Sequence, residues 1–355
     1  MPTKNILPLT PEIISKIAAG EVIERPAFAV KELVENSIDA KADKISIVLE
    51  QSGLKKIMVT DNGIGMSKED LLESFKLHTT SKLFSLDDLE KIKSLGFRGE
   101  ALASIAAISK LTLQSRVGHR PNGTKIELVD GQIKDIAPIG MPPGTVVTVN
   151  NLFYSVPARK KFLKTPPTEF RHILQVLTNL VFANPQIHFY LVHNKKIIFD
   201  LPKTKDPLER IKFFLGNNIF INLLPVQYQN DFIAISGFVS KPHLPISLNN
   251  KHYFFINNRG VTNQLIEQAG KEGYGTLLPA KAKPVLILFL SIPYELVDVN
   301  VHPRKEQVHF ANQQLVYDAV EKAVRETLTK NNLTFYAQEG LGGLALGEAS
   351  LAITK

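Results

Sequence analysis

The sequence contains no cysteine, and this absence excludes three kinds of chemistry at once. Disulfides, thiolate zinc sites and a cysteine nucleophile all need a residue type that is missing from the 355 positions. Long apolar runs are missing too, because stretches such as residues 285–290 are far too short to span a bilayer. The first residues (MPTKN) lack the apolar core of a secretory signal. We therefore expect a soluble, cytoplasmic protein without a membrane partner.

The composition is that of an ordinary globular chain. Hydrophobic residues make up 44% and charged residues 21%, which is too apolar for intrinsic disorder. The net charge of +8 favours an anionic partner such as nucleic acid or a nucleotide phosphate, although so modest an excess decides nothing alone.

Hydrophobic periodicity predicts an α+β chain with two domains. Residues 26–40 have helical spacing, residues 45–49 and 57–60 alternate as strands, and residues 188–192 and 196–200 complete a sheet covered by helices. We expect a two-layer α/β sandwich over residues 1–204, because the proline-flanked segment 202–207 suits a boundary. A second, smaller α/β domain follows over 205–331, ending in a helix at 313–328. Residues 332–355 are expected to be a linker or tail.

The predicted helix at 26–40 has two chemically different faces. Val30, Val34 and Ile38 share one face. The polar residues opposite them are Glu32, Glu35, Asn36 and Asp39. Glu32 and Asn36 lie one turn apart and can address one ligand, as a general base beside an oxygen donor for magnesium. A solvated helix face explains the same pattern, and it is the commoner case.

Two glycine-rich segments are candidates for ligand binding. Residues 61–66 (DNGIGM) follow a strand, and their glycines permit close backbone approach to a ligand, although Asn-Gly is also a strong hairpin signal. Residues 96–101 (GFRGEA) open a helix, and together with residues 78–82 they bracket a polar segment that suits a lid over a phosphate. A loop with a glycine cap is the alternative.

Taken together, the motifs resemble those of the GHKL ATPases, the superfamily of DNA gyrase B, heat-shock chaperone ATPases, histidine kinases and MutL. Within this superfamily, the motif sequences are most similar to those of the MutL family of DNA mismatch repair proteins. The matching stretches are residues 17–22, 31–40, 79–82, 96–102, 157–159 and 298–303. The resemblance covers about residues 5–330, and residues 96–102 (GFRGEAL) carry its most diagnostic string.

The resemblance implies a GHKL (Bergerat) fold that binds ATP and Mg²⁺ and hydrolyses ATP slowly. Glu32 would be the general base, Asn36 would ligate Mg²⁺, and Asp61 would accept a hydrogen bond from the adenine amine. Thr145, Gly63 and Gly65 would surround the same ring. The lid and its neighbourhood would comprise Thr79, Ser81, Lys82, Phe97, Arg98, Gly99 and Ala101.

The second domain, which we expect to be ribosomal-protein-like and to act as a transducer, would contribute to the same site. By the resemblance, Lys305 would reach the γ-phosphate and Asn300 would support its loop, which makes ATP binding an interdomain and dimer-forming switch. A surface lysine beside Arg304 is the plain alternative. The first 25 residues look like the family segment that crosses to the partner subunit, with Ile13, Ile14 and Ile17 as a contact row.

A cluster of cations predicts non-specific DNA binding. The candidates are Arg159, Lys160, Lys161, Lys164 and Arg171, with Lys281 and Lys283 in the second domain. Such charges neutralise phosphates with little sequence preference, although a solvated basic helix has the same composition.

The resulting hypothesis is a bacterial mismatch repair switch, nucleoid-associated when on DNA. It would couple mismatch recognition by a MutS-type protein to a downstream nicking endonuclease and helicase, as an ATP-dependent homodimer. A type II topoisomerase-like ATPase subunit, a histidine kinase and an ATP-binding scaffold without hydrolysis are the alternatives. The chain lacks the long linker and the C-terminal dimerisation domain of the family, so we interpret it as an N-terminal ATPase fragment. Two departures are Asn258, where glycine is usual, and Ser155, where asparagine is usual.

Overall fold

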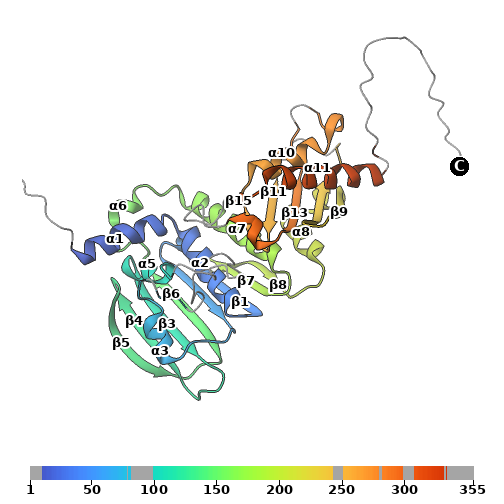
Figure 1. Cartoon of the computed structure of the whole chain (residues 1–355). Coiled ribbons are helices and arrows are strands. Elements are labelled where there is room, and N and C mark those ends of the chain that lie inside the picture. Colours follow the sequence, from blue (N-terminus) through green and yellow to red (C-terminus); the bar gives the residue numbers. More distant parts are fainter. Residues whose placement is uncertain are drawn as a thin grey trace, which may run out of the picture.

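The computed structural model describes residues 10–77, 79–80, 99–242, 251–279, 282–298, 308–331 and 333. Within these residues the chain forms two large mixed sheets, each with helices packed on it (Figure 1). The α+β class is confirmed.

The first sheet has eight strands in the order β5-β4-β3-β6-β2-β1-β7-β8. Their bounds are β1 Lys44–Glu50, β2 Lys56–Asp61, β3 Lys110–Arg116, β4 Gly123–Val129, β5 Gln132–Ile139, β6 Gly144–Asn150, β7 His188–His193 and β8 Lys196–Leu201. The β1–β7 pair is parallel and the other pairs are antiparallel. Buried residues alternate with half-buried ones along β1 and β3, so the apolar face of the sheet is the one that helices cover.

Helices form the second layer of this domain. They are α1 Pro11–Val22, α2 Pro26–Asp39, α3 Lys68–Glu73, α5 Ala101–Ala107, α6 Pro157–Lys160 and α7 Pro166–Ala183, with the 3₁₀ turn η1 Gln51–Gly53. Pro26 stands at the start of α2 and Pro166 at the start of α7, where the missing N–H costs no hydrogen bond. α2 packs on α7, and both contribute to one apolar core with the sheet. The two-layer sandwich is confirmed.

The second sheet has the order β12-β11-β13-β10-β9. Its strands are β9 Leu223–Gln229, β10 Ala234–Ser240, β11 His252–Ile256, β12 Arg259–Val261 and β13 Leu286–Ser291. α10 Gln264–Glu272 and α11 Gln313–Lys330 pack together over it and enclose a separate core (Figure 1). The remaining elements are α8 Pro207–Leu215, α9 Asn217–Phe220, η3 Gly275–Leu277, η4 Tyr294–Leu296 and the short pair β14 Val297–Asp298 and β15 His309–Phe310.

An apolar cluster joins the two domains. Phe182, at the end of α7, is fully buried and lies 5.0 Å from the Tyr253 ring of β11 and 5.6 Å from the Phe214 ring of α8. Ile211 and Leu215 of α8 belong to the same cluster. The second sheet therefore packs directly on a helix of the first domain.

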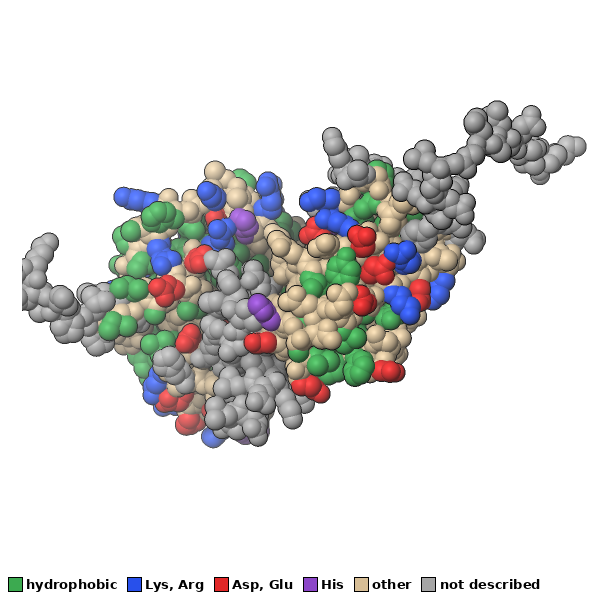
Figure 2. Space-filling view, turned by 45° about the horizontal axis from the view of Figure 1, so that its top comes forward, with side chains coloured by type: hydrophobic (Ala, Val, Ile, Leu, Met, Phe, Trp, Pro, Cys, Tyr) green, Lys and Arg blue, Asp and Glu red, His purple; other side chains and the backbone are tan. Residues whose placement is uncertain are grey.

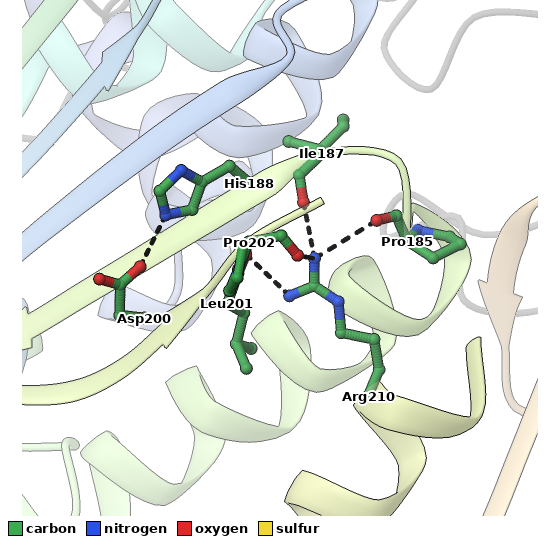
Figure 3. A network of polar contacts seen from close by, with 7 residues as sticks. All are labelled: Pro185, Ile187, His188, Asp200, Leu201, Pro202 and Arg210. Atoms are coloured by element: carbon green, nitrogen blue, oxygen red, sulfur yellow. Dashed lines mark hydrogen bonds and ion pairs between the residues drawn. The ribbon is translucent and has the colours of Figure 1, made fainter. Parts of the chain in front are cut away.

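Arg210 fixes the connection between β8 and α8 (Figure 3). The residue is 2% exposed, and its guanidinium donates to the carbonyl oxygens of Leu201 (3.1 Å), Ile187 (2.9 Å), Pro202 (2.6 Å) and Pro185 (3.3 Å). Burial lowers the pKa of Arg210, but a guanidinium stays charged at any ordinary pH. The connection between β8 and α8 coincides with the segment 202–207. The division of the chain into 1–204, 205–331 and 332–355 therefore remains a proposal.

Candidate functional site

Glu32 and Asn36 of α2, which the sequence places one helical turn apart, are both half-buried. Glu32 and Asn36 lie one turn apart on the helix, while Val30 and Val34 are buried in the core. Their spacing lets a carboxylate and a carboxamide face one ligand. Half-burial limits hydration of both groups without enclosing them.

Glu35 is more deeply buried than the other acidic residues of α2. Only 4% of it is exposed, and its Oε1 lies 3.2 Å from Nζ of Lys31. The polar side of α2 is therefore not evenly accessible, because Glu35 is buried whereas Glu32, Asn36 and Asp39 are half-buried. The Glu35 carboxylate is paired within the protein.

Asp61 occupies the end of β2 and is tied to α2. Its Oδ2 accepts a hydrogen bond from the Ser37 hydroxyl at 2.9 Å, and its Oδ1 accepts one from the Gly63 N–H at 2.9 Å. Burial raises the pKa of Asp61, and these hydrogen bonds oppose the rise only in part. Asp61 is thus a partly desolvated acceptor at a strand end.

Strand pairing brings Thr145 beside Asp61. The two residues are register partners in the β2–β6 pair, and Thr145 Oγ1 lies 2.9 Å from Ser115 Oγ on β3. Ser115 also accepts from the Met66 N–H at 2.8 Å. The sequence reasoning did not identify Ser37 or Ser115. A signal existed for Ser37, a polar residue next to Asn36, but none for Ser115, because its place depends on pairing between distant strands.

The glycines of this region are required by close approach of the protein's own backbone. A Cβ at Gly65 (φ 70°) would lie 2.1 Å from the Arg116 carbonyl oxygen, and one at Gly144 (φ 127°) would lie 2.1 Å from that of Asp61. Any side chain would place its Cβ against these carbonyl oxygens, so both positions require glycine. The segment after Asp61 is not a hairpin turn, because β2 pairs with β1 and β6. The side chain of Asn62 instead accepts from the Asp43 and Lys44 N–H groups.

Two flanks of the predicted lid lie side by side. Gly99 has φ 63°, and a Cβ there would be 2.2 Å from the Thr79 carbonyl oxygen. The Thr79 hydroxyl lies 2.7 Å from the Glu73 carbonyl oxygen, and Ala101 begins α5. The remaining predicted lid residues, Ser81, Lys82, Phe97 and Arg98, lie outside the described residues, as do Asn300 and Lys305.

The predicted DNA-binding cations differ in their accessibility. Lys160, Lys161 and Lys164 are exposed, and Figure 2 shows Lys and Arg side chains along the upper edge of the first domain. Arg159 is half-buried, and its guanidinium covers Gly20 of α1, where a Cβ would lie 2.3 Å from Nε. Arg171 and Lys283 are exposed, and Lys281 lies outside the described residues. Arg159 therefore packs α6 against α1, whereas the three lysines are exposed to solvent.

The two departures from the family pattern are accommodated. Asn258 has φ 67°, the left-handed conformation that asparagine tolerates. The Ser155 hydroxyl donates to the Ala107 carbonyl oxygen at 3.0 Å and so holds the end of α5.

The described residues contain neither a ready-made metal cluster nor a membrane span. In that part of the chain, no group of three or more His, Cys, Asp or Glu residues could hold a metal ion. Nor does any helix there combine the length and apolarity that crossing a bilayer requires.

Comparison with known proteins identifies both halves of the chain. Residues 23–135 match the family described as histidine kinase-, DNA gyrase B- and HSP90-like ATPase, and residues 211–329 match the DNA mismatch repair protein, C-terminal domain. The MutL protein of Syntrophotalea carbinolica is 42% identical over 325 residues, which cover 91% of this chain and 51% of that protein. The chain belongs to the MutL family of DNA mismatch repair proteins.

Other MutL relatives agree with this assignment. The protein of Chlorobaculum tepidum is 40% identical over 332 residues, covering 92% of this chain and 53% of its own length. The chain thus spans about half the length of the curated relatives it matches. The family assignment decides against the topoisomerase-like and histidine kinase alternatives.

Solved structures show the same fold. The Aquifex aeolicus MutL ATPase domain complexed with ADP is 29% identical, with a TM-score of 0.59 over 84% of this chain and 98% of that one. The N-terminal domain of a DNA repair protein is 27% identical, with a TM-score of 0.75 over 90% and 99% of the two chains. The first domain is therefore a GHKL-type ATPase domain of a MutL protein.

Proposed function

We propose that this MutL chain binds ATP beside α2 and β2 and hydrolyses it to ADP and phosphate. The observation that supports this most directly is the junction of Asp61, Ser37 and Thr145, where a partly desolvated acceptor ends a strand within a glycine-rich backbone. A carboxylate at this position suits the exocyclic amine of adenine. A solved MutL ATPase domain of this fold was obtained with ADP.

The proposed chemistry needs a general base for the attacking water. Glu32 would take a proton from a water molecule whose oxygen bonds to the γ-phosphorus, while the bond from that phosphorus to the bridging oxygen breaks. Mg²⁺, when bound, would neutralise charge on the phosphates. The amide oxygen of Asn36 suits it as a protein ligand, because magnesium is commonly bound by one or two side chains plus substrate phosphates.

The roles of the lid and of the second domain are part of the same proposal. Thr79, Gly99 and Ala101, with Ser81, Lys82, Phe97 and Arg98, would close over the triphosphate. Lys305, supported by Asn300, would sense the γ-phosphate, so ATP would drive two copies to associate. In mismatch repair such a dimer would pass recognition by a MutS-type protein to a nicking endonuclease and a helicase.

Incubation with ATP tests this proposal directly. With Mg²⁺, the chain should release ADP and phosphate, and a nonhydrolysable ATP analogue should raise its sedimentation coefficient toward that of a dimer. Failure to release phosphate at any protein concentration would overturn the enzymatic proposal. A coefficient unchanged by the analogue would overturn the dimer switch alone.

The DNA-binding proposal rests on the exposed lysines around α6. Replacing Lys160 and Lys161 together by alanine should lower the magnitude of the slope of log Kobs against log [salt] by about 1.8 for duplex DNA, because each phosphate that a lysine neutralises contributes about 0.9. Lys330→Ala, an exposed lysine at the end of α11, is the matched control and should leave the slope unchanged. Arg159→Ala should change the slope less than either lysine, because its guanidinium packs on α1. Wild-type affinity that does not decline between low and physiological salt would contradict the proposal.

A further inference from the structure

Arg259 is a charged residue of the second domain that is almost completely buried. It begins β12 immediately after a two-residue turn, in which Asn257 (φ 49°) and Asn258 (φ 67°) both adopt left-handed conformations. Such a turn matches the twist of the two strands that it joins. Only 8% of Arg259 is exposed. Burial of a guanidinium is costly unless nearby negative charge compensates for it.

The turn before Arg259 is anchored to the strand next to it. The Asn257 Nδ2 donates to the Ile292 carbonyl oxygen at 2.8 Å, and the Ile292 N–H donates to the Asn257 Oδ1 at 3.0 Å. The Asn257 N–H donates to the Leu290 carbonyl oxygen at 2.9 Å. These hydrogen bonds fix the backbone of Arg259 relative to the second sheet.

β12 lies directly against the first domain. A Cβ on Gly260 would be 3.2 Å from Cβ of Asn179 on α7, and α7 in turn packs on α2. Phe182, one turn further along α7, is buried against the Tyr253 ring of β11. The second sheet thus carries Arg259 to the side of the first domain where α2 lies.

The negative charges that act on Arg259 come from carboxylates of α2. Burial lowers the pKa of Arg259, whereas the carboxylates of Glu35, Asp39 and Glu32 oppose that change. Glu35 is itself buried and also pairs with Lys31 of its own helix. Three carboxylates on one helix repel each other and would repel a triphosphate, so a cation beside them offsets both effects.

We propose that Arg259 is a positioning residue for ATP hydrolysis, which holds the carboxylate-bearing side of α2, and with it Glu32, in the orientation that activates water. This inference rests on the proposed role of Glu32 as the base. It makes hydrolysis depend on how the second domain is seated against α2, in addition to the contact that Lys305 would make with the γ-phosphate. Arg259 itself would not touch the nucleotide.

The test separates the rate of hydrolysis from the affinity for nucleotide. Arg259→Gln should lower kcat between about 10- and 100-fold, the cost of a small misplacement of a catalytic group, and should change Kd for a nonhydrolysable ATP analogue by less than about twofold. Arg259→Lys should restore part of kcat, since it keeps the charge but not the planar guanidinium. If the glutamine variant does not fold, the lysine variant alone should show reduced kcat at unchanged Kd.

Arg210→Lys is the matched control, because Arg210 is also a buried arginine near the domain junction but donates to carbonyl oxygens. It should lower the free energy of unfolding and leave kcat unchanged. The inference is overturned if Arg259→Gln keeps wild-type kcat, or if kcat, analogue affinity and stability decline in parallel. The variant Glu32→Ala separates failure of this inference from failure of the proposed function. If Glu32→Ala hydrolyses ATP at the wild-type rate, Glu32 is not the general base, whatever the result for Arg259.

Discussion

Replacing Glu32 by alanine should lower the rate of ATP hydrolysis by about 10²- to 10⁴-fold, the range expected for loss of a general base. The affinity for ATP should stay within about twofold of wild type, because the acceptor proposed for adenine is on β2 and the proposed magnesium ligand is Asn36. Glu32 is only half-buried on α2, so truncation leaves the apolar side of the helix intact. Single-turnover hydrolysis and equilibrium binding of a nonhydrolysable analogue measure the two quantities separately.

Two further variants make the Glu32 result specific. Glu32→Gln keeps the shape of the side chain and should lose nearly as much activity as alanine, because an amide cannot accept the proton. Glu326→Ala removes a half-buried carboxylate on α11 that lies 3.6 Å from Nζ of Lys330, far from the proposed site, so it should leave both rate and affinity unchanged. Parallel losses of ATP affinity and hydrolysis in Glu32→Ala would show that Glu32 holds the nucleotide or the helix rather than the water.

The elements that sequence predicts well are those with a strong one-sided pattern. α2, α7 and α11 each place apolar residues at helical spacing, and buried positions such as Val30, Leu177 and Val320 follow that spacing. β5 and β9 were not predicted, because neither carries a strong apolar pattern: β5 is largely exposed, and Pro225 lies within β9. Their existence depends on hydrogen bonding to β4 and β10, which a local pattern does not record.

The site shows the same division between local and long-range information. The spacing of Glu32 and Asn36 is a property of one helix and could be read from the chain. The meeting of Asp61 with Thr145 depends on antiparallel pairing of β2 with β6, more than 80 positions away, and only the family resemblance anticipated it. Tertiary packing also explains why Glu35 is buried and why Arg159 lies over Gly20.

Replacing Asp61 by asparagine should abolish most nucleotide binding while leaving the fold intact. The asparagine oxygen can accept the Gly63 N–H, and its amide can donate to the Ser37 hydroxyl, whose own proton then goes to the Leu33 carbonyl oxygen 3.2 Å away. Toward adenine, however, the carboxylate oxygen that would accept a hydrogen bond is replaced by an amide NH2, which is a donor facing the exocyclic amine, another donor. Leaving both groups unsatisfied costs about 1–3 kcal/mol each, so ATP affinity should decrease about 30-fold or more.

At neutral pH the Asp61→Asn variant should gain stability relative to wild type, although it loses affinity for the nucleotide. Because burial raises the pKa of Asp61 above its ordinary value of 3.8, its contribution to stability is fully present below pH 3.8 and is lost as pH rises through the folded-state pKa. The neutral asparagine does not incur that loss, so the free energy of unfolding of Asp61→Asn, relative to wild type, should increase from acid to neutral pH. Denaturant unfolding across this range, together with analogue binding at neutral pH, measures both effects. A variant that binds the analogue like wild type would remove Asp61 from the nucleotide site, whereas a variant destabilised at neutral pH would show that the carboxylate, despite its desolvation, is needed to join β2 to α2.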